Sequence, residues 1–184
     1  IDMFFIAAFG SQYALGLYSF CSTIIEGLNQ FFVLIQTNVN SPLAKRIRNH
    51  ELETIGEVFH KNGKYLTGLA ILSAASSLLA IFCLERYFVD LRFYPKGYQI
   101  LFILSVGYVI SSRYVPIMMI FNQTQNPHYY RDQLIFIAVT NLLLNSILVP
   151  NFGAVGAAVA TSISSIFGIL FLKFQIKKYL GLLV

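Results

Sequence analysis

The stretch NLLLNSILVPNFGAVGAAVAT, residues 141–161, joins the end of one apolar run to the beginning of another. Between the two runs stands Pro150-Asn-Phe-Gly153, a cluster of residues that predicts a tight turn. The flanking runs cover residues 128–149 and 153–175, and each has the roughly 20 residues that a helix needs to cross a bilayer. We therefore predict two membrane-spanning helices that are joined by a short turn.

Three further runs of this length precede them, at residues 12–37, 64–88 and 97–121. Residues 1–9 form a shorter apolar piece, which we expect to be the end of a sixth helix whose start is missing. None of the runs alternates apolar with polar residues, as the strands of a membrane β-barrel must. The expected fold is an all-α integral membrane bundle over residues 1–184, with five full transmembrane helices and part of a sixth.

The composition supports a lipid environment. Hydrophobic residues make up 57% of the chain and charged residues 11%, whereas soluble domains carry about a quarter charged residues. The net charge of +5 does not predict nucleic-acid binding, because the basic residues stand in small clusters between apolar runs and form no extended patch. Cys21 and Cys83 both lie inside apolar runs, where small buried thiols are expected, and their spacing matches no metal or disulfide motif.

Breaker residues mark the links between the runs. Gly10 and Ser11 separate the first piece from the next run, and Ser11 is a plausible N-cap. Residues 94–97 are expected to begin the 97–121 helix, and Asn126-Pro127 to end it.

The longest polar segment covers residues 38–63. Leu52, Ile55 and Phe59 recur there at helical spacing, with charged residues between them. This pattern predicts an amphipathic helix over about residues 50–61 that lies on the membrane surface. A solvated connector without such a helix is the alternative.

The basic residues are distributed unequally between the two sets of links. One set carries nine, and the other carries only Arg86, Arg92 and Lys96. The positive-inside rule therefore places the first set in the cytoplasm, together with the 38–63 segment, the link near residue 130 and the C-terminus. The expected localisation is the cytoplasmic membrane, crossed several times. The nine are Lys45, Arg46, Arg48, Lys61, Lys64, Arg131, Lys173, Lys177 and Lys178.

Glu26 is the most costly residue in the apolar runs, because a carboxylate at the bilayer centre costs at least ~2.5 kcal/mol. At steps of three and four it shares a helix face with Ser19, Ser22, Thr23 and Gln30. We predict either a wet cavity wall that contacts substrate or a coupling ion, or a buried hydrogen-bond network between helices.

Arg113 is the second charged residue at membrane depth, in the 97–121 run just before Pro116. Its side chain either extends to the cytoplasmic interface or faces the cavity. In the cavity it would pair with Glu26 or contact an anionic substrate, since a guanidinium matches phosphate oxygens.

Two further patterns indicate helix packing. Asn141 and Asn145 share one face of the 128–149 helix and are expected to form interhelical hydrogen bonds. Gly156, Ala160, Ser164 and Gly168 recur every four residues, a spacing of small side chains that lets two helices approach closely.

No catalytic constellation is visible in the sequence. The histidines lie in the links, and neither a zinc-protease motif, a nucleophile elbow nor a phosphate-binding loop occurs. We therefore predict a non-enzyme that needs no cofactor and no metal.

Residues 141–161 resemble the signature of polysaccharide-biosynthesis exporters. In that family an Asn-rich helix ends in Pro, and a Gly-x-x-Gly-Ala-Ala-x-Ala-Thr sequence opens the next helix, as Gly153 to Thr161 does here. Residues 14–19, ALGLYS, are similar to a second family element. The family includes O-antigen flippases and belongs to the superfamily of multidrug and oligosaccharidyl-lipid exporters.

The resemblance implies that the chain is the C-terminal lobe of a two-lobed transporter, whose N-terminal lobe is missing here. Such a transporter would flip lipid-linked oligosaccharide or polysaccharide precursors, for example of lipopolysaccharide, by alternating access. Its partners would be the lipid-linked glycan, membrane lipid and the other lobe. An ion-coupled drug extruder of the same superfamily and a non-transporting membrane protein are the alternatives.

Overall fold

The computed structural model describes residues 1–48, 52–87, 96–114 and 128–180, with side chains described within 1–34, 63–83, 96–114, 128–175 and 177–178. Every element in these ranges is a helix, which confirms the all-α prediction. The helices are α1 (Asp2–Phe9), α2 (Gln12–Arg48), α3 (Leu52–Tyr87), α4 (Lys96–Ser112) and α7 (His128–Leu180).

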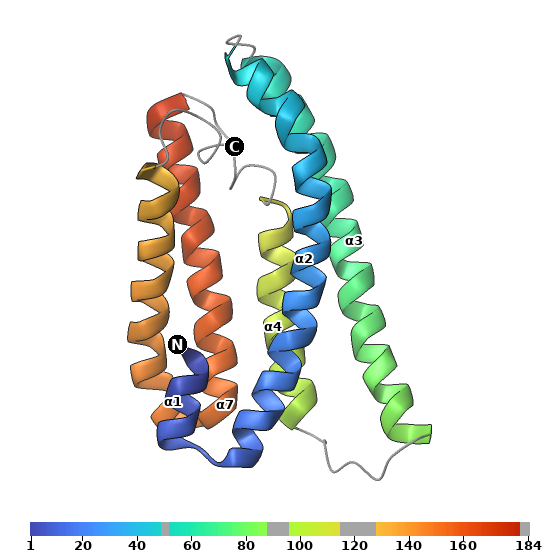
Figure 1. The fold of residues 1–184 in the computed structure, drawn as a ribbon, viewed down its shortest axis with the longest axis vertical. Helices are drawn as coiled ribbons and strands as arrows, with labels where there is room; N and C mark the ends of the chain where they lie inside the picture. Colours follow the sequence, from blue (N-terminus) through green and yellow to red (C-terminus); the bar gives the residue numbers. More distant parts are fainter. Residues whose placement is uncertain (49–51, 88–95, 115–127, 181–184) are drawn as a thin grey trace.

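Helix α7 is folded into a hairpin at Gly153, so that its first arm (residues 128–152) and its second arm (residues 154–180) lie side by side (Figure 1). Gly153 has φ 58° and ψ −137°, a conformation that glycine adopts without steric cost. The predicted turn is therefore present, but only Gly153 leaves the helical conformation. The Asn151 side-chain amide donates to the Ile147 carbonyl at 2.7 Å, which satisfies a backbone acceptor next to the bend.

Helix α4 lies between the α7 hairpin and the pair formed by α2 and α3 (Figure 1). Its contact with the second arm of α7 is very close, because a Cβ atom at Gly107 would lie 2.9 Å from the Ser162 Cα. The Ser162 hydroxyl donates to the Ile103 carbonyl at 2.8 Å across the same contact. On its other side, the ring of Tyr108 of α4 packs at a tilt against the ring of Phe32 of α2, with the ring centroids 5.5 Å apart. The Tyr108 hydroxyl lies 3.1 Å from the Ser73 hydroxyl of α3.

Helix α1 is short and packs against α7 and α2 near the bend of the hairpin (Figure 1). It ends before Gly10, and the Ser11 side-chain oxygen accepts a hydrogen bond from the Ala14 amide at 3.2 Å. This is the geometry of an N-cap, which confirms the predicted role of Ser11 at the start of α2.

The structure differs from the sequence prediction in the polar segment at residues 38–63. Helix α2 continues to Arg48, and α3 begins at Leu52, so most of this segment is helical backbone. Residues 50–61, where we predict a separate surface helix, contribute the first turns of α3 without a break, apart from residues 50 and 51, which lie outside the described residues. The physical reason is that a helix satisfies its own backbone in water as well as in lipid, so the end of an apolar run need not end the helix.

Helix α4 ends at Ser112, short of the predicted 121, and residues 113 and 114 form a turn. In a longer helix the Ser112 carbonyl would accept the N–H of residue 116, which is proline and has none. Residues 115–121, including Pro116, and the predicted helix end at Asn126-Pro127 lie outside the described residues.

Two described helices contain segments that are long and apolar enough to cross a membrane, Gly63–Cys83 of α3 and His128–Gln175 of α7. Five full spans, the number predicted from the sequence, are therefore not supported by length and apolarity. Many large apolar side chains are nevertheless exposed on several helices, among them Phe4, Phe31, Leu72 and Phe174. Such a surface suits a lipid environment better than water.

The close approach of α4 and α7 gives a testable prediction. Gly107→Leu should lower the free energy of unfolding by about 1–3 kcal/mol, because the new side chain meets the Ser162 backbone. The control is Gly68→Leu in α3, where nothing lies within 4 Å and leucine should raise helix stability by up to about 1 kcal/mol. Equilibrium unfolding in mixed micelles, followed by circular dichroism, measures both, and equal stability of the two variants would contradict the described contact.

Candidate functional site

The carboxylate of Asp2 is the centre of a hydrogen-bond network between three helices. Its Oδ2 accepts hydrogen bonds from the Tyr18 hydroxyl of α2 at 2.5 Å and from the Thr161 hydroxyl of α7 at 2.6 Å. Its Oδ1 accepts one from the Asn145 side-chain amide at 2.7 Å. The Asp2 side chain therefore links α1 to α2 and to both arms of the hairpin.

The two asparagines of the first arm extend this network. The Asn145 amide also contacts the Asn141 carbonyl at 2.9 Å, and the Asn141 amide donates weakly to the Thr161 hydroxyl at 3.4 Å. Asn145 is fully buried and Asn141 nearly so. The pair forms interhelical contacts, and its main acceptor is a carboxylate on a third helix.

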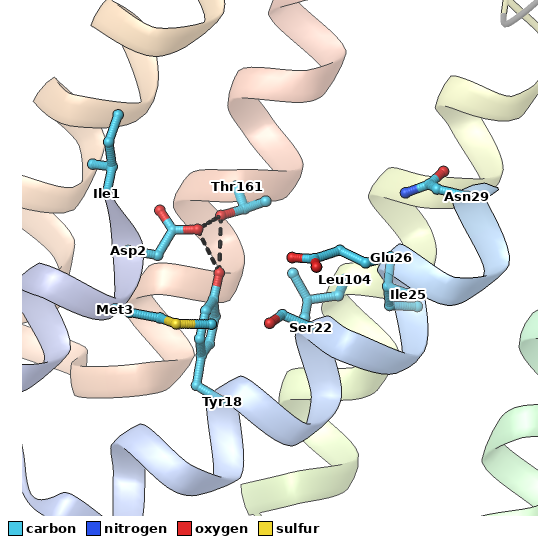
Figure 2. A pocket seen from close by; sticks show the side chains of 10 residues that line it. All are labelled: Ile1, Asp2, Met3, Tyr18, Ser22, Ile25, Glu26, Asn29, Leu104 and Thr161. Carbon is cyan, nitrogen blue, oxygen red and sulfur yellow. Dashed lines mark hydrogen bonds between the residues drawn. The ribbon is translucent and has the colours of Figure 1, made fainter. Parts of the chain in front are cut away.

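A cavity of about 280 Å³ opens beside this network. Figure 2 shows Asp2, Tyr18 and Thr161 on one side of it and Ser22, Glu26 and Asn29 of α2 on the other. Apolar side chains complete the lining, from Ile1, Met3, Ile25 and Leu104. The cavity is thus bounded by α1, α2, α4 and the second arm of α7, and it contains two carboxylates.

Of the α2 face that the sequence suggested as a cavity wall, Ser22 and Glu26 line this cavity. Neither an ion pair nor a hydrogen bond joins the Glu26 carboxylate to another described residue, in contrast to the carboxylate of Asp2. Glu26 therefore remains available to a ligand.

Ser19, Thr23 and Gln30 of the α2 stripe lie outside the cavity lining. The hydroxyl of Thr23 donates to the Ser19 carbonyl at 2.8 Å, so both residues are engaged within their own helix. Gln30 is exposed and does not line the cavity. Ser22, which belongs to the same stripe, does line it, although its hydroxyl also contacts the Ser19 carbonyl at 3.2 Å.

Arg113 lies apart from the cavity. It follows the last residue of α4, nine positions beyond the cavity residue Leu104, or about 13 Å along a helix axis at 1.5 Å per residue. Its Cγ would be 3.1 Å from a Cβ at Gly63, so its stem packs against α3. Its Nε is buried without a hydrogen-bond partner among the described residues, and no ion pair with Glu26 occurs among them.

The small residues of the second α7 arm lie in the hairpin contact. A Cβ atom at Gly156 would collide with the Leu148 carbonyl, and one at Gly168 with the Ile137 side chain, both of the first arm. Ala160 and Ser164 between them are buried. The small residues at these positions therefore let the two arms of α7 approach closely near Gly156 and near Gly168.

Asp2 was not predicted to be a functional residue. A carboxylate in the apolar piece DMFFIAAF is as unusual as Glu26 in its own run, so the argument that singled out Glu26 applied to Asp2 as well. Tyr18 carried no such signal, because tyrosine is common in membrane helices and its partner is far away in the sequence.

Cysteines and metal-ligand types add no further site within the described ranges. Cys21 is buried, with its Sγ 3.6 Å from the Gly97 carbonyl, and Cys83 is exposed, and both are free thiols. The described residues contain no group of three or more His, Cys, Asp or Glu side chains that could hold a metal ion.

Comparisons with family models, curated proteins and solved structures find no match for this chain.

The Asp2 network predicts a strong dependence of stability on one side chain. Asp2→Ala removes the shared acceptor of three hydrogen bonds, so it should lower the free energy of unfolding by about 2–4 kcal/mol. Asp132→Ala is the control, because its exposed ion pair with Arg131 is worth at most about 1 kcal/mol. Chemical unfolding in micelles compares the two variants, and an equal loss in both would show that the network does not stabilise the fold.

Proposed function

We propose that this chain is part of a membrane transporter that flips lipid-linked oligosaccharide or polysaccharide precursors across the cytoplasmic membrane. The observation that carries the proposal is the cavity between the helices, which two carboxylates line from α1 and α2. Polar groups at this depth are costly in lipid and mark substrate pathways. The resemblance of residues 141–161 to polysaccharide exporters supports the same function, and Asn141, Asn145 and Thr161 of that stretch belong to the Asp2 network.

The proposed arrangement in the membrane has more crossings than the two candidate spans. In it α2, α3, α4 and each arm of α7 cross the bilayer, and α1 is the end of a further crossing helix. The polar ends of α2 and α3 then lie in the cytoplasm with the C-terminus, and the bend at Gly153 lies outside. The unequal distribution of basic residues supports this orientation.

The proposed mechanism is alternating access. A second lobe of the same protein would face this one across the cavity, and the two would rock so that the cavity opens first inside and then outside. The sugar headgroup of the cargo would pass through the cavity, where Glu26, Ser22 and Asn29 offer hydrogen-bond partners, while its lipid tail remains in the bilayer.

An ion-coupled drug extruder is the second candidate function. It is favoured by the uncompensated carboxylate of Glu26, which could bind a proton or a cation and couple its flow to export. Transport of a cationic dye that depends on an ion gradient, with no glycan export, would favour this function over the flippase.

The orientation can be tested with single cysteines in a background that lacks Cys21 and Cys83. We expect Phe152→Cys, at the exposed bend of α7, to react with a membrane-impermeant maleimide in intact cells. Lys177→Cys, near the exposed C-terminal end of α7, should react only after permeabilisation. The reverse pattern would invert the topology, and labelling of both in intact cells would contradict an odd number of crossings between them.

The transport role can be tested by complementation of a strain that lacks its glycan flippase, with the chain in its full-length protein. Glu26→Gln should reduce glycan export at least about tenfold, because it removes the free carboxylate of the cavity. Arg113→Ala should also impair export if its unpartnered Nε contacts the pyrophosphate of the cargo at the cytoplasmic end of α4. Thr23→Val is the control, since its hydroxyl is engaged within α2.

Membrane levels of each variant are measured by immunoblot, which separates a transport defect from a failure to insert. Normal export by both Glu26→Gln and Arg113→Ala at normal membrane levels would remove these residues from the mechanism.

A further inference from the structure

Two acidic side chains line the cavity. Asp2 and Glu26 line it from opposite sides (Figure 2), and no lysine or arginine side chain is among its lining residues. The single ion pair in the described part of the chain is Arg131–Asp132, so neither carboxylate of the cavity is paired there. Glu26 is exposed and Asp2 half-buried in the described chain, and in the proposed membrane setting such carboxylates are costly unless a ligand compensates them.

The two carboxylates differ in how they are engaged. Asp2 already accepts hydrogen bonds from Tyr18, Thr161 and Asn145. Glu26 has no such partner, and it has Ser22 and Asn29 beside it on the same helix (Figure 2). A ligand that enters the cavity would therefore meet Glu26 as its free charged acceptor and the two neutral side chains as further partners.

The size of the cavity distinguishes a bare ion from an organic group. One water molecule occupies about 30 Å³ in the liquid, so the cavity of about 280 Å³ could hold several waters and is far larger than a single monovalent cation needs. Small-molecule sites begin at about 300 Å³. The cavity lies just below that range, so a ligand that fills it would be no larger than one sugar-sized group.

We infer that this cavity recognises a cationic amino group carried on a sugar, and that it rejects the anionic pyrophosphate of a lipid-linked cargo. An ammonium group would donate to Glu26 in a charge-assisted hydrogen bond, and the sugar hydroxyls would contact Ser22 and Asn29. A phosphate would face two like charges there, whereas the partnerless Nε of Arg113 lies outside the cavity. The link from this recognition to export rests on the proposed function; the binding preference itself does not.

The binding preference is measured on the protein in phosphatidylcholine nanodiscs by isothermal titration calorimetry. The probes are glucosamine, N-acetylglucosamine and glucose, at a pH of about 6 so that the amine is protonated. We expect glucosamine to bind at least about tenfold more tightly than the two uncharged sugars, the ratio that one charge-assisted hydrogen bond provides. Equal affinity for the three sugars, or no binding of any of them, would overturn the inference.

Variants of α2 and competing cations test whether Glu26 is the residue that binds the amino group. Glu26→Gln should abolish the preference for glucosamine, and Thr23→Val on the same helix should retain it. An unchanged preference in Glu26→Gln would overturn the inference. Displacement of glucosamine by sodium chloride, but not by choline chloride at equal ionic strength, would identify a bare-cation site and also overturn it.

The binding measurement tests the cation recognition and the export assay tests the transport role, so either claim can be contradicted while the other holds. A glucosamine preference that depends on Glu26, together with normal export by Glu26→Gln, supports the cation recognition and contradicts the transport role. Impaired export by Glu26→Gln without any glucosamine preference supports the transport role and overturns the cation recognition.

Discussion

The carboxylate of Asp2 is the interaction on which the rest of the described structure depends. A charged group among apolar helices is tolerated only when other groups satisfy its hydrogen-bonding capacity, and Tyr18, Thr161 and Asn145 do so from α2 and from both arms of α7. These three hydrogen bonds hold the short helix α1 against its neighbours, and Asp2, Tyr18 and Thr161 line one side of the cavity.

Close packing contacts also hold the helices together. Lipid provides little hydrophobic drive for helix association, so membrane helices rely on packing between small residues and on hydrogen bonds. Gly107 against Ser162 joins α4 to α7, and Gly156 and Gly168 join the two arms of the hairpin.

The acidic side chains of the cavity and the basic side chain of Arg113 lie at different places along the bundle. The two cavity carboxylates lie on α1 and α2, in a cavity that Leu104 of α4 also lines, whereas Arg113 follows the last residue of α4. At that end Lys173 of α7 lies 5.0 Å from the centre of the Tyr114 ring. A cargo with a cationic or donor-rich sugar and an anionic pyrophosphate would find complementary groups at these two places. This separation was not apparent from the sequence, which allowed Glu26 and Arg113 to be partners.

The sequence by itself determined the helical nature of the chain, the bend at Gly153 and the cap at Ser11, because each depends on apolar run length or on local backbone chemistry. It singled out Glu26 for the same reason, since a carboxylate in an apolar run is costly wherever it points. Helix ends in the polar segments were misjudged, because helical backbone satisfies itself beyond the apolar run. Only the tertiary structure decided that Asp2 has partners up to 159 positions away in the sequence, and that Arg113 and Gln30 lie outside the cavity, because distances between helices are set by packing that no local pattern encodes.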